Sequence, residues 1–209
     1  MPRKIPQRSF SAKLKIKPTN LPPKRKKRNP LVREYLRPDE VNAMIQAARK
    51  KGRHSVRDAA IILIMFRHGL RTAELVALKW QQVDLKAGYL DVHRAKRGNN
   101  AKHPLRGPEL RALREVQREY PNSPYVFVSE RRAPLSTRSI REIVARVGKL
   151  AKLSFAPHPH QLRHACGYYL ASQGHDTRAI QDYLGHKHIM HTVRYTAMAP
   201  QRFESFWND

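Results

Sequence analysis

The chain has 209 residues, enough for one compact domain with extensions or at most two small domains. Its 42 Lys and Arg residues against 16 Asp and Glu give a formal net charge of +26, which favours a polyanion as partner. Ribosomal proteins and membrane-surface proteins share this composition, so the charge alone does not choose among these classes. The single cysteine, Cys166, excludes an intramolecular disulfide, and its apolar neighbours predict a small core residue.

The first 33 residues are expected to form a basic arm without a core of its own. Six prolines interrupt any helix there, and no acidic residue precedes Glu34. Two readings remain open, a solvated tail without a role and an arm that grasps DNA. The basic cluster on which the second reading depends consists of Lys24, Arg25, Lys26, Lys27 and Arg28.

Two helices are predicted next. The first covers residues 38–50, because proline followed by two acids suits the first turn and the positive end of the helix dipole. Ser55 and Asp58 resemble a capping box in front of a strongly apolar, hence buried, helix over 58–68. Gly69 is well placed to end that helix.

A third helix is expected to begin near Thr72, and three short strands follow it. Turn residues separate segments rich in alternating apolar side chains, which is typical of an antiparallel sheet. The predicted strands cover residues 82–85, 89–93 and 101–105.

The rest of the chain is predicted to be mainly helical. Asp176 is the expected N-cap of the last of four helices, and Gly174 and Gly185 are each placed to end one. These helices cover residues 108–119, 136–153, 160–173 and 177–184. A short amphipathic segment follows, with Phe203, Phe206 and Trp207 on one face. The expected fold class is mainly α (α+β), helical with a small three-stranded antiparallel sheet.

The sequence predicts a cytoplasmic protein. The basic N-terminus lacks the apolar segment of a signal peptide. The longest apolar run, residues 59–66, is far shorter than the ~20 residues that cross a bilayer.

Five residues have side chains suited to breaking a phosphodiester. Guanidinium groups fit the charge that grows on a scissile phosphate, because they stay ionised and present a planar fork of donors. His160 and Arg163 share one face of a helix and lie in its first turn, where backbone N–H groups attract phosphate. Arg71 follows a buried helix upstream, and His186 and Tyr195 follow downstream.

Together these residues resemble the catalytic domain of the tyrosine recombinases, the phage integrase family. The motifs that carry the resemblance are G-L-R-T-A-E-L from Gly69, H-Q-L-R-H from His160, L-G-H from Leu184 and T-V-R-Y ending at Tyr195. Each motif alone is weak, but their order and spacing are specific. The resemblance covers residues 35–198 and is strongest to short recombinases that invert fimbrial promoter elements. It implies a catalytic domain with a C-terminal helical tail over residues 34–209.

The resemblance also implies roles for the site residues. Arg71 and Arg163 would clamp the scissile phosphate, and Tyr195 would attack it, leaving a 3′-phosphotyrosine and a free 5′-hydroxyl. His160 would accept a proton or donate to the phosphate, and His186 matches the third histidine of the family. No cofactor is implied.

Two further residues take roles from the same resemblance. Lys96, between the second and third strands, would donate a proton to the leaving 5′-oxygen, and Glu74 would hold the region of Arg71 in place. We expect His164 to pack or bond structurally, and the role of His191 is open. A zinc site at the histidines near residue 188 is not expected, because no cysteine or carboxylate completes a ligand set.

The expected partner is double-stranded DNA in the nucleoid, bound by a homotetramer on paired sites. Members of the family usually carry a separate N-terminal DNA-binding domain, whereas this sequence has the basic arm, so a DNA-bending accessory protein is also expected. Inversion is the expected outcome, with integration or excision of a mobile element as the alternative. Two other classes stay open, a catalytically silent DNA-binding regulator and an enzyme of the type IB topoisomerase kind.

Overall fold

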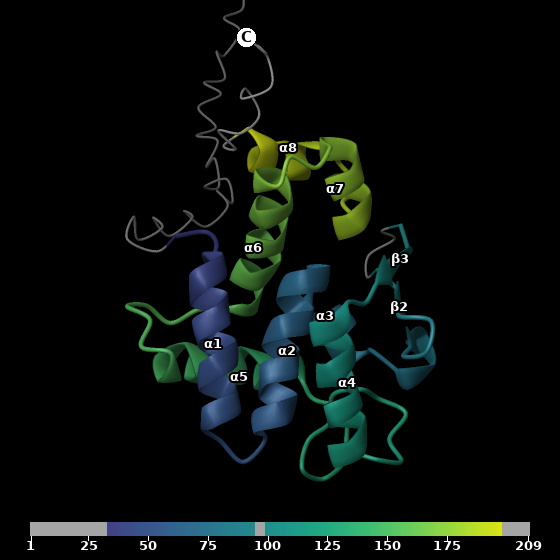
Figure 1. Ribbon diagram of the computed structural model, residues 1–209. Coiled ribbons are helices and arrows are strands. Elements are labelled where there is room, and N and C mark those ends of the chain that lie inside the picture. The colour runs from purple at the N-terminus through teal and green to yellow at the C-terminus, as the bar shows by residue number, and fades with distance from the viewer. Residues whose placement is uncertain (1–32, 95–98, 198–209) are drawn as a thin grey trace, which may run out of the picture. The chain divides into compact units, whose positions relative to one another are not determined.

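The computed structural model describes residues 33–94 and 99–197, and it is mainly helical with one small sheet (Figure 1). The first two helices, α1 (Pro38–Lys50) and α2 (Ser55–His68), lie side by side. The predicted bounds of α1 are confirmed. The expected fold class is confirmed as well.

Helix α2 lies at the centre of the fold because it is apolar on nearly every side. Ile61, Ile62 and Ile64 are completely buried. Besides α1, helices α4 (Gly107–Glu119) and α6 (Pro159–Ser172) pack against it. A helix that is hydrophobic all round must be covered in this way, as its sequence predicted.

The sheet has three antiparallel strands in the order β1-β2-β3. A 3₁₀ turn, η1 (Trp80–Gln82), leads into β1 (Val83–Asp84), which pairs with β2 (Tyr89–Val92). The register of β2 with β3 (Ala101–Pro104) places Leu90 opposite His103. All three predicted strands are therefore confirmed, each one or two residues shorter than expected.

Helices α5 and α7 each begin at a side-chain cap. Ser136 accepts a hydrogen bond from the Ser139 N–H at 3.0 Å and starts α5 (Thr137–Leu150). Asp176 accepts one from the Ala179 N–H at 2.9 Å and starts α7 (Thr177–Leu184), as predicted.

Helix α7 ends at Gly185, whose φ of 63° is the left-handed conformation. The last described helix, α8 (Met190–Thr196), packs on α6 and α7 (Figure 1). No helix was predicted over these residues.

The predicted capping box at Ser55 is wrong. Ser55 is the first residue of α2, and His54 precedes the helix without a capping side chain. The Asp58 carboxylate instead forms ion pairs with Arg57 and with Arg146 of α5. Asp58 therefore contacts a residue of α5 instead of forming a cap within the first turn of α2.

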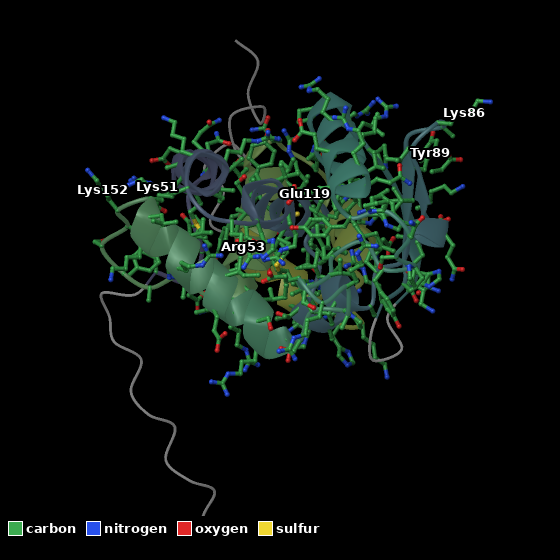
Figure 2. All side chains as sticks on the ribbon, turned by 90° about the horizontal axis from the view of Figure 1, so that it is seen from below. Lys51, Arg53, Lys86, Tyr89, Glu119 and Lys152 are labelled. Atoms are coloured by element: carbon green, nitrogen blue, oxygen red, sulfur yellow. The ribbon has the colours of Figure 1, made fainter. Side chains whose placement is uncertain are left out.

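Basic side chains cover much of the described surface, as the net charge requires. Lys51, Arg53, Lys86 and Lys152 are all exposed. Figure 2 shows Lys86 and Lys152 projecting outward at opposite sides of the view. Cys166, in contrast, is buried, as predicted.

Several predictions fall outside the described residues. They concern the predicted arm except for its last residue, Arg33, together with its cluster at 24–28, the lysine at position 96 and the aromatic segment 203–207. Among the helices that are described, none has the length and apolar character needed to span a bilayer.

Candidate active site

Arg71 lies at the start of a short helix beside the centre of the fold. Gly69, with a φ of 56°, ends α2 and turns the chain toward α3 (Thr72–Val76). The backbone N–H and the guanidinium of Arg71 donate to the two carboxylate oxygens of Glu74, at 2.9 and 2.7 Å. The Arg71 side chain keeps an exposed fraction of 30%, so part of its guanidinium remains accessible to a ligand.

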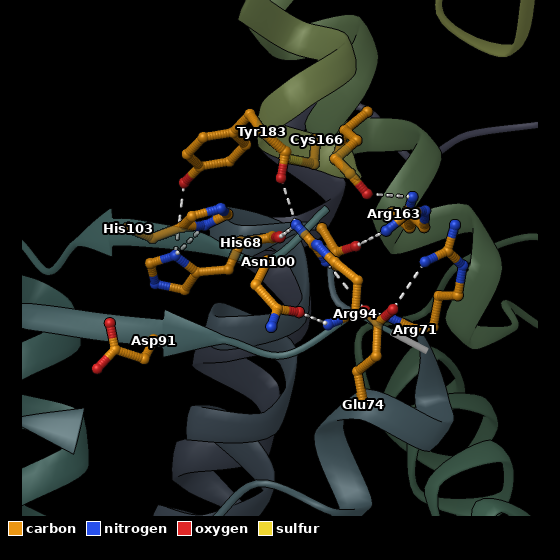
Figure 3. A network of polar contacts seen from close by, with 12 residues as sticks. His68, Arg71, Glu74, Asp91, Arg94, Asn100, His103, Arg163, Cys166 and Tyr183 are labelled. Atoms are coloured by element: carbon orange, nitrogen blue, oxygen red, sulfur yellow. Dashed lines mark hydrogen bonds and ion pairs between the residues drawn. The ribbon is translucent and has the colours of Figure 1, made fainter. Parts of the chain in front are cut away.

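Arg94, two residues after β2, forms a second and fully buried ion pair with Glu74. Its guanidinium donates to the Glu74 carboxylate at 2.9 Å, and Figure 3 shows Glu74 between Arg94 and Arg71. The same guanidinium donates to the backbone carbonyls of His68 and Tyr183. Burial alone would raise the pKa of Glu74, but the hydrogen bond from the Arg71 N–H and the charge of Arg94 lower it.

Arg163 is a buried arginine on α6 that joins two loops of the site. Its guanidinium donates to the carbonyl of Gly69 and, at 2.6 Å, to the carbonyl of Leu184 (Figure 3). Burial, together with the charges of Arg71 and Arg94, lowers the pKa of Arg163 to about 10, so the group stays ionised at neutral pH.

The site therefore has an excess of positive charge. After burial, the charge of Arg71 contributes to the lowered pKa of both Arg94 and Arg163, and Glu74 is the carboxylate that contacts Arg71 and Arg94. An anion bound here would relieve this repulsion, and the planar forks of the guanidiniums suit a phosphate.

His160 lies at the N-terminal end of α6, one turn before Arg163. Pro159 begins the helix, and the Gln161 side chain accepts a hydrogen bond from the His158 N–H at 2.9 Å. Partial desolvation and the charge of Arg163 lower the pKa of His160. His160 is exposed at this end of the helix, so its side chain is accessible to a phosphate beside the two arginines.

His186 follows the glycine that ends α7, and its ring is fixed by a hydroxyl of α8. Its Nδ1 lies 2.8 Å from the Thr192 Oγ1. Burial and then the charges of Arg163 and Arg71 lower the pKa of His186 to about 3, so the ring is neutral at neutral pH. If Nδ1 accepts the Thr192 proton, Nε2 carries a hydrogen and can donate to a phosphate oxygen.

Tyr195 is buried on α8, with an exposed fraction of 2%. Its hydroxyl lies 2.8 Å from His164 Nδ1, and its ring lies 6.1 Å from the ring of His186. The ring packs on Gly167 of α6, where a side chain would leave no room for it. Burial raises the pKa of Tyr195 to about 12, although the charge of Arg163 acts against the rise.

The structure thus brings five of the six predicted catalytic residues to one place, with Glu74 beside Arg71. Lys96 lies outside the described residues. Sequence reasoning did not find the buried position of Arg94, nor the bond of His164 to the Tyr195 hydroxyl. Within residues 33–94 and 99–197 no group of three or more His, Cys, Asp or Glu could hold a metal ion.

Comparison with known proteins agrees with this arrangement. The model of the phage integrase family matches residues 34–202. The type 1 fimbriae regulatory protein FimB of Escherichia coli (strain K12) is 41% identical over 84% of this chain and 90% of its own length. FimE of the same strain is 43% identical over 84% and 91%. The tyrosine recombinase XerA of Pyrococcus furiosus is 31% identical over 79% of this chain and 58% of its own.

Solved structures give the same result for the fold. The crystal structure of XerA recombinase matches 85% of this chain and 65% of that chain, with a TM-score of 0.72 and 28% identity. A lambda integrase fragment, crystallised as a dimer on a COC′ core site, matches 75% and 59%, with a TM-score of 0.62 and 26% identity. Fold and site thus define an enzyme that breaks and rejoins DNA. The chain belongs to the phage integrase family and is a tyrosine site-specific recombinase.

Proposed function

We propose that this recombinase cleaves DNA by attack of Tyr195 on a phosphate held between Arg71 and Arg163. The observation that supports the proposal is the placement of the buried Arg163 guanidinium. It binds the loop before Arg71 and the end of the helix before His186, and the charges of both arginines act on that histidine, which supports a single anion site among the three residues. A buried, charged environment of this kind stabilises the additional charge of a pentacoordinate phosphate.

Each residue of the site then has a task in the reaction. The arginines neutralise the phosphate, and His160 and His186 lie beside it as hydrogen-bond donors, with His160 alternatively taking the nucleophile's proton. Lys96 protonates the leaving 5′-oxygen. Glu74 holds Arg71, which it contacts through both carboxylate oxygens.

The covalent 3′-phosphotyrosine conserves the energy of the broken phosphodiester, so rejoining needs no nucleotide. The 5′-hydroxyl of a partner strand attacks the phosphotyrosine, and two rounds of paired cuts require four protomers on two sites. The net charge of +26 suits a double-stranded DNA partner. A DNA-bending accessory protein and the basic arm of residues 1–33 complete the assembly, which acts in the nucleoid.

Inversion of a DNA segment is the proposed outcome, as in phase variation. The support is the identity of 41% and 43% to two proteins named as regulators of type 1 fimbriae. Integration or excision of a mobile element is the alternative outcome.

The test is covalent capture on genomic DNA of the source organism. The full chain is incubated with sheared DNA, protein–DNA adducts are isolated under denaturing conditions, and the attached ends are sequenced. We expect adducts at inverted repeats beside a promoter, and none with Tyr195→Phe. Absence of any adduct would instead support a DNA-binding regulator.

A nicked duplex built on the mapped site then measures strand transfer to a second duplex. Transfer between duplexes identifies a recombinase, whereas resealing of the same strand alone identifies a topoisomerase.

A further inference from the structure

We infer that His164 is the catalytic group that receives the proton of the Tyr195 hydroxyl when the tyrosine attacks the phosphate. The inference rests on the proposed function, because it assumes that Tyr195 is the nucleophile. It assigns different roles to the two histidines on α6: His160 donates to the phosphate, and His164 takes the proton of the nucleophile.

The first support is contact with the reacting atom. His164 Nδ1 lies 2.8 Å from the Tyr195 hydroxyl oxygen, which is hydrogen-bonding distance. The two rings meet edge to face with their centroids 5.8 Å apart. A proton acceptor must lie within such a distance of the proton it removes, and His164 meets this condition in the described structure.

The second support is the direction of that hydrogen bond. Burial raises the pKa of Tyr195 to about 12, so its phenol is protonated and able to donate. Burial and the neighbouring His160 and Arg194 lower the pKa of His164 to about 3, so its imidazole is neutral and able to accept. The tyrosine hydroxyl therefore donates to Nδ1, and Nε2 of His164 carries the remaining ring proton.

The third support is the isolation of this pair from bulk water. His164 has an exposed fraction of 8% and Tyr195 one of 2%. Water has little access to the hydroxyl, so its proton needs an acceptor within the protein. The ring of Tyr168 lies edge to face against Tyr195 at 5.0 Å and helps to close this side.

The fourth support is that substrate binding would strengthen His164 as a base. The charged and titratable groups facing its ring are His160 and Arg163 on α6, Arg194 on α8 and Glu34, which is ion-paired with Arg194. The basic members of this group lower the proton affinity of His164. Of these groups, Arg163 belongs to the proposed phosphate site, so a phosphate bound there offsets its charge and raises the proton affinity of His164 in the complex that reacts.

The step balances without any further reactant. A bond forms between the Tyr195 oxygen and phosphorus, and the bond between phosphorus and the 5′-oxygen breaks. The electron pair of the broken bond leaves with the 5′-oxygen, which takes a proton from Lys96. The phenol proton passes to His164 Nδ1, and it returns when a 5′-hydroxyl attacks the phosphotyrosine.

The test compares full-length variants in single-turnover capture on the nicked duplex described above. His164→Asn keeps an oxygen that can accept the tyrosine hydrogen bond but is not basic, and His164→Gln is a second variant in case the first does not fold. We expect both to slow adduct formation by about 100-fold or more, the usual contribution of a positioned base.

A fluorinated nucleophile separates proton transfer from a structural role. Replacing Tyr195 with 3,5-difluorotyrosine lowers the pKa of the phenol, so that loss of its proton depends less on a base. We expect this replacement to restore most of the lost rate in His164→Asn. The matched control is His160→Asn, whose rate the fluorinated tyrosine should not restore, because the proposal assigns His160 to the phosphate and not to the tyrosine proton.

The outcomes are distinct. Capture at the wild-type rate in His164→Asn, faster capture, or a slow rate that difluorotyrosine does not restore would each overturn the inference alone. A wild-type chain that forms no adduct, or Tyr195→Phe that still forms one, overturns the proposed function and this inference with it.

Discussion

Replacing Gly167 with alanine should displace the nucleophile from α6. An added Cβ would lie 2.5 Å from Tyr195 Cε2, 2.7 Å from Cδ2 and 2.8 Å from Cζ. Ordinary contacts of a Cβ begin at 3.4 Å, so the ring must retreat by roughly 1 Å. A helix carrying the nucleophile then moves away from the helix that carries Arg163 and His164.

The magnitude follows from this displacement. Misplacing a reacting group by about 1 Å costs roughly 100-fold in rate. Overpacking a core contact costs about 1–3 kcal/mol of stability, which corresponds to a fall in melting temperature of about 2–12 °C for a domain of this size. We therefore expect Gly167→Ala to slow covalent capture by about 100-fold while the chain remains folded.

Capture on the nicked duplex and thermal unfolding measure the two effects, and a filter-binding assay should show unchanged DNA affinity. Gly107→Ala is the matched control, because its added Cβ meets only the flexible end of the Arg111 side chain, 3.2 Å away. If Gly167→Ala captured DNA at the wild-type rate, this prediction would be wrong, because the Tyr195 ring would then have to leave α6 before it attacks.

Two further predictions concern the buried polar groups. Arg94→Met removes the fully buried partner of the Glu74 carboxylate and should lower the free energy of unfolding in urea by about 3–5 kcal/mol. Adding Glu74→Gln should recover part of that loss. If the effects of the two substitutions were simply additive, the pairing would be contradicted. The pKa values of His68 and His103 are lowered by burial from 6.5 to about 3, so the unfolded chain binds more protons. The contribution of these histidines to the free energy of unfolding should be fully present above about pH 6.5. It should fall toward pH 3, by at most about 1.4 kcal/mol per pH unit for each histidine. His103→Phe should make thermal unfolding depend less on pH, and an unchanged pH dependence would argue against this assignment.

Elements with strong local signals could be predicted from the sequence. Asp176 caps α7, and Gly69 and Gly185 end two helices in the left-handed conformation, because each residue acts within its own turn. The apolar composition of α2 likewise determined its central position. These interactions join residues that are close in sequence. The strands could be predicted for the same reason, because their signals were turn residues and apolar alternation within short segments.

Elements that depend on tertiary contacts could not be predicted. Helix α8 has no capping side chain at Ile189, and its buried residues, Thr192 and Tyr195, face α6 and α7. The Ser55 prediction failed because Asp58 pairs with Arg146, which is distant in sequence. In a chain with 42 Lys and Arg residues, nothing local marks Arg94 as buried.

The end of α7 explains why the phosphate site and the nucleophile form one unit. The last carbonyls of a helix lack partners within it, and here those of Tyr183 and Leu184 receive the buried guanidiniums of Arg94 and Arg163. The helix dipole favours these positive charges at its C-terminus. Because the chain passes directly from this end to His186 and then to α8, the same arginines hold both the histidine and Tyr195.

Loss of capture in an Arg163 variant therefore combines two causes, a missing phosphate contact and a displaced α7. An Arg71 variant separates these two causes. The Arg71 side chain is 30% exposed and pairs with Glu74 in its own helix rather than with α7. A defect in Arg71→Ala therefore includes the missing phosphate contact but no loss of a direct contact with α7, and the difference between the two variants measures how far the position of Tyr195 depends on the buried arginine.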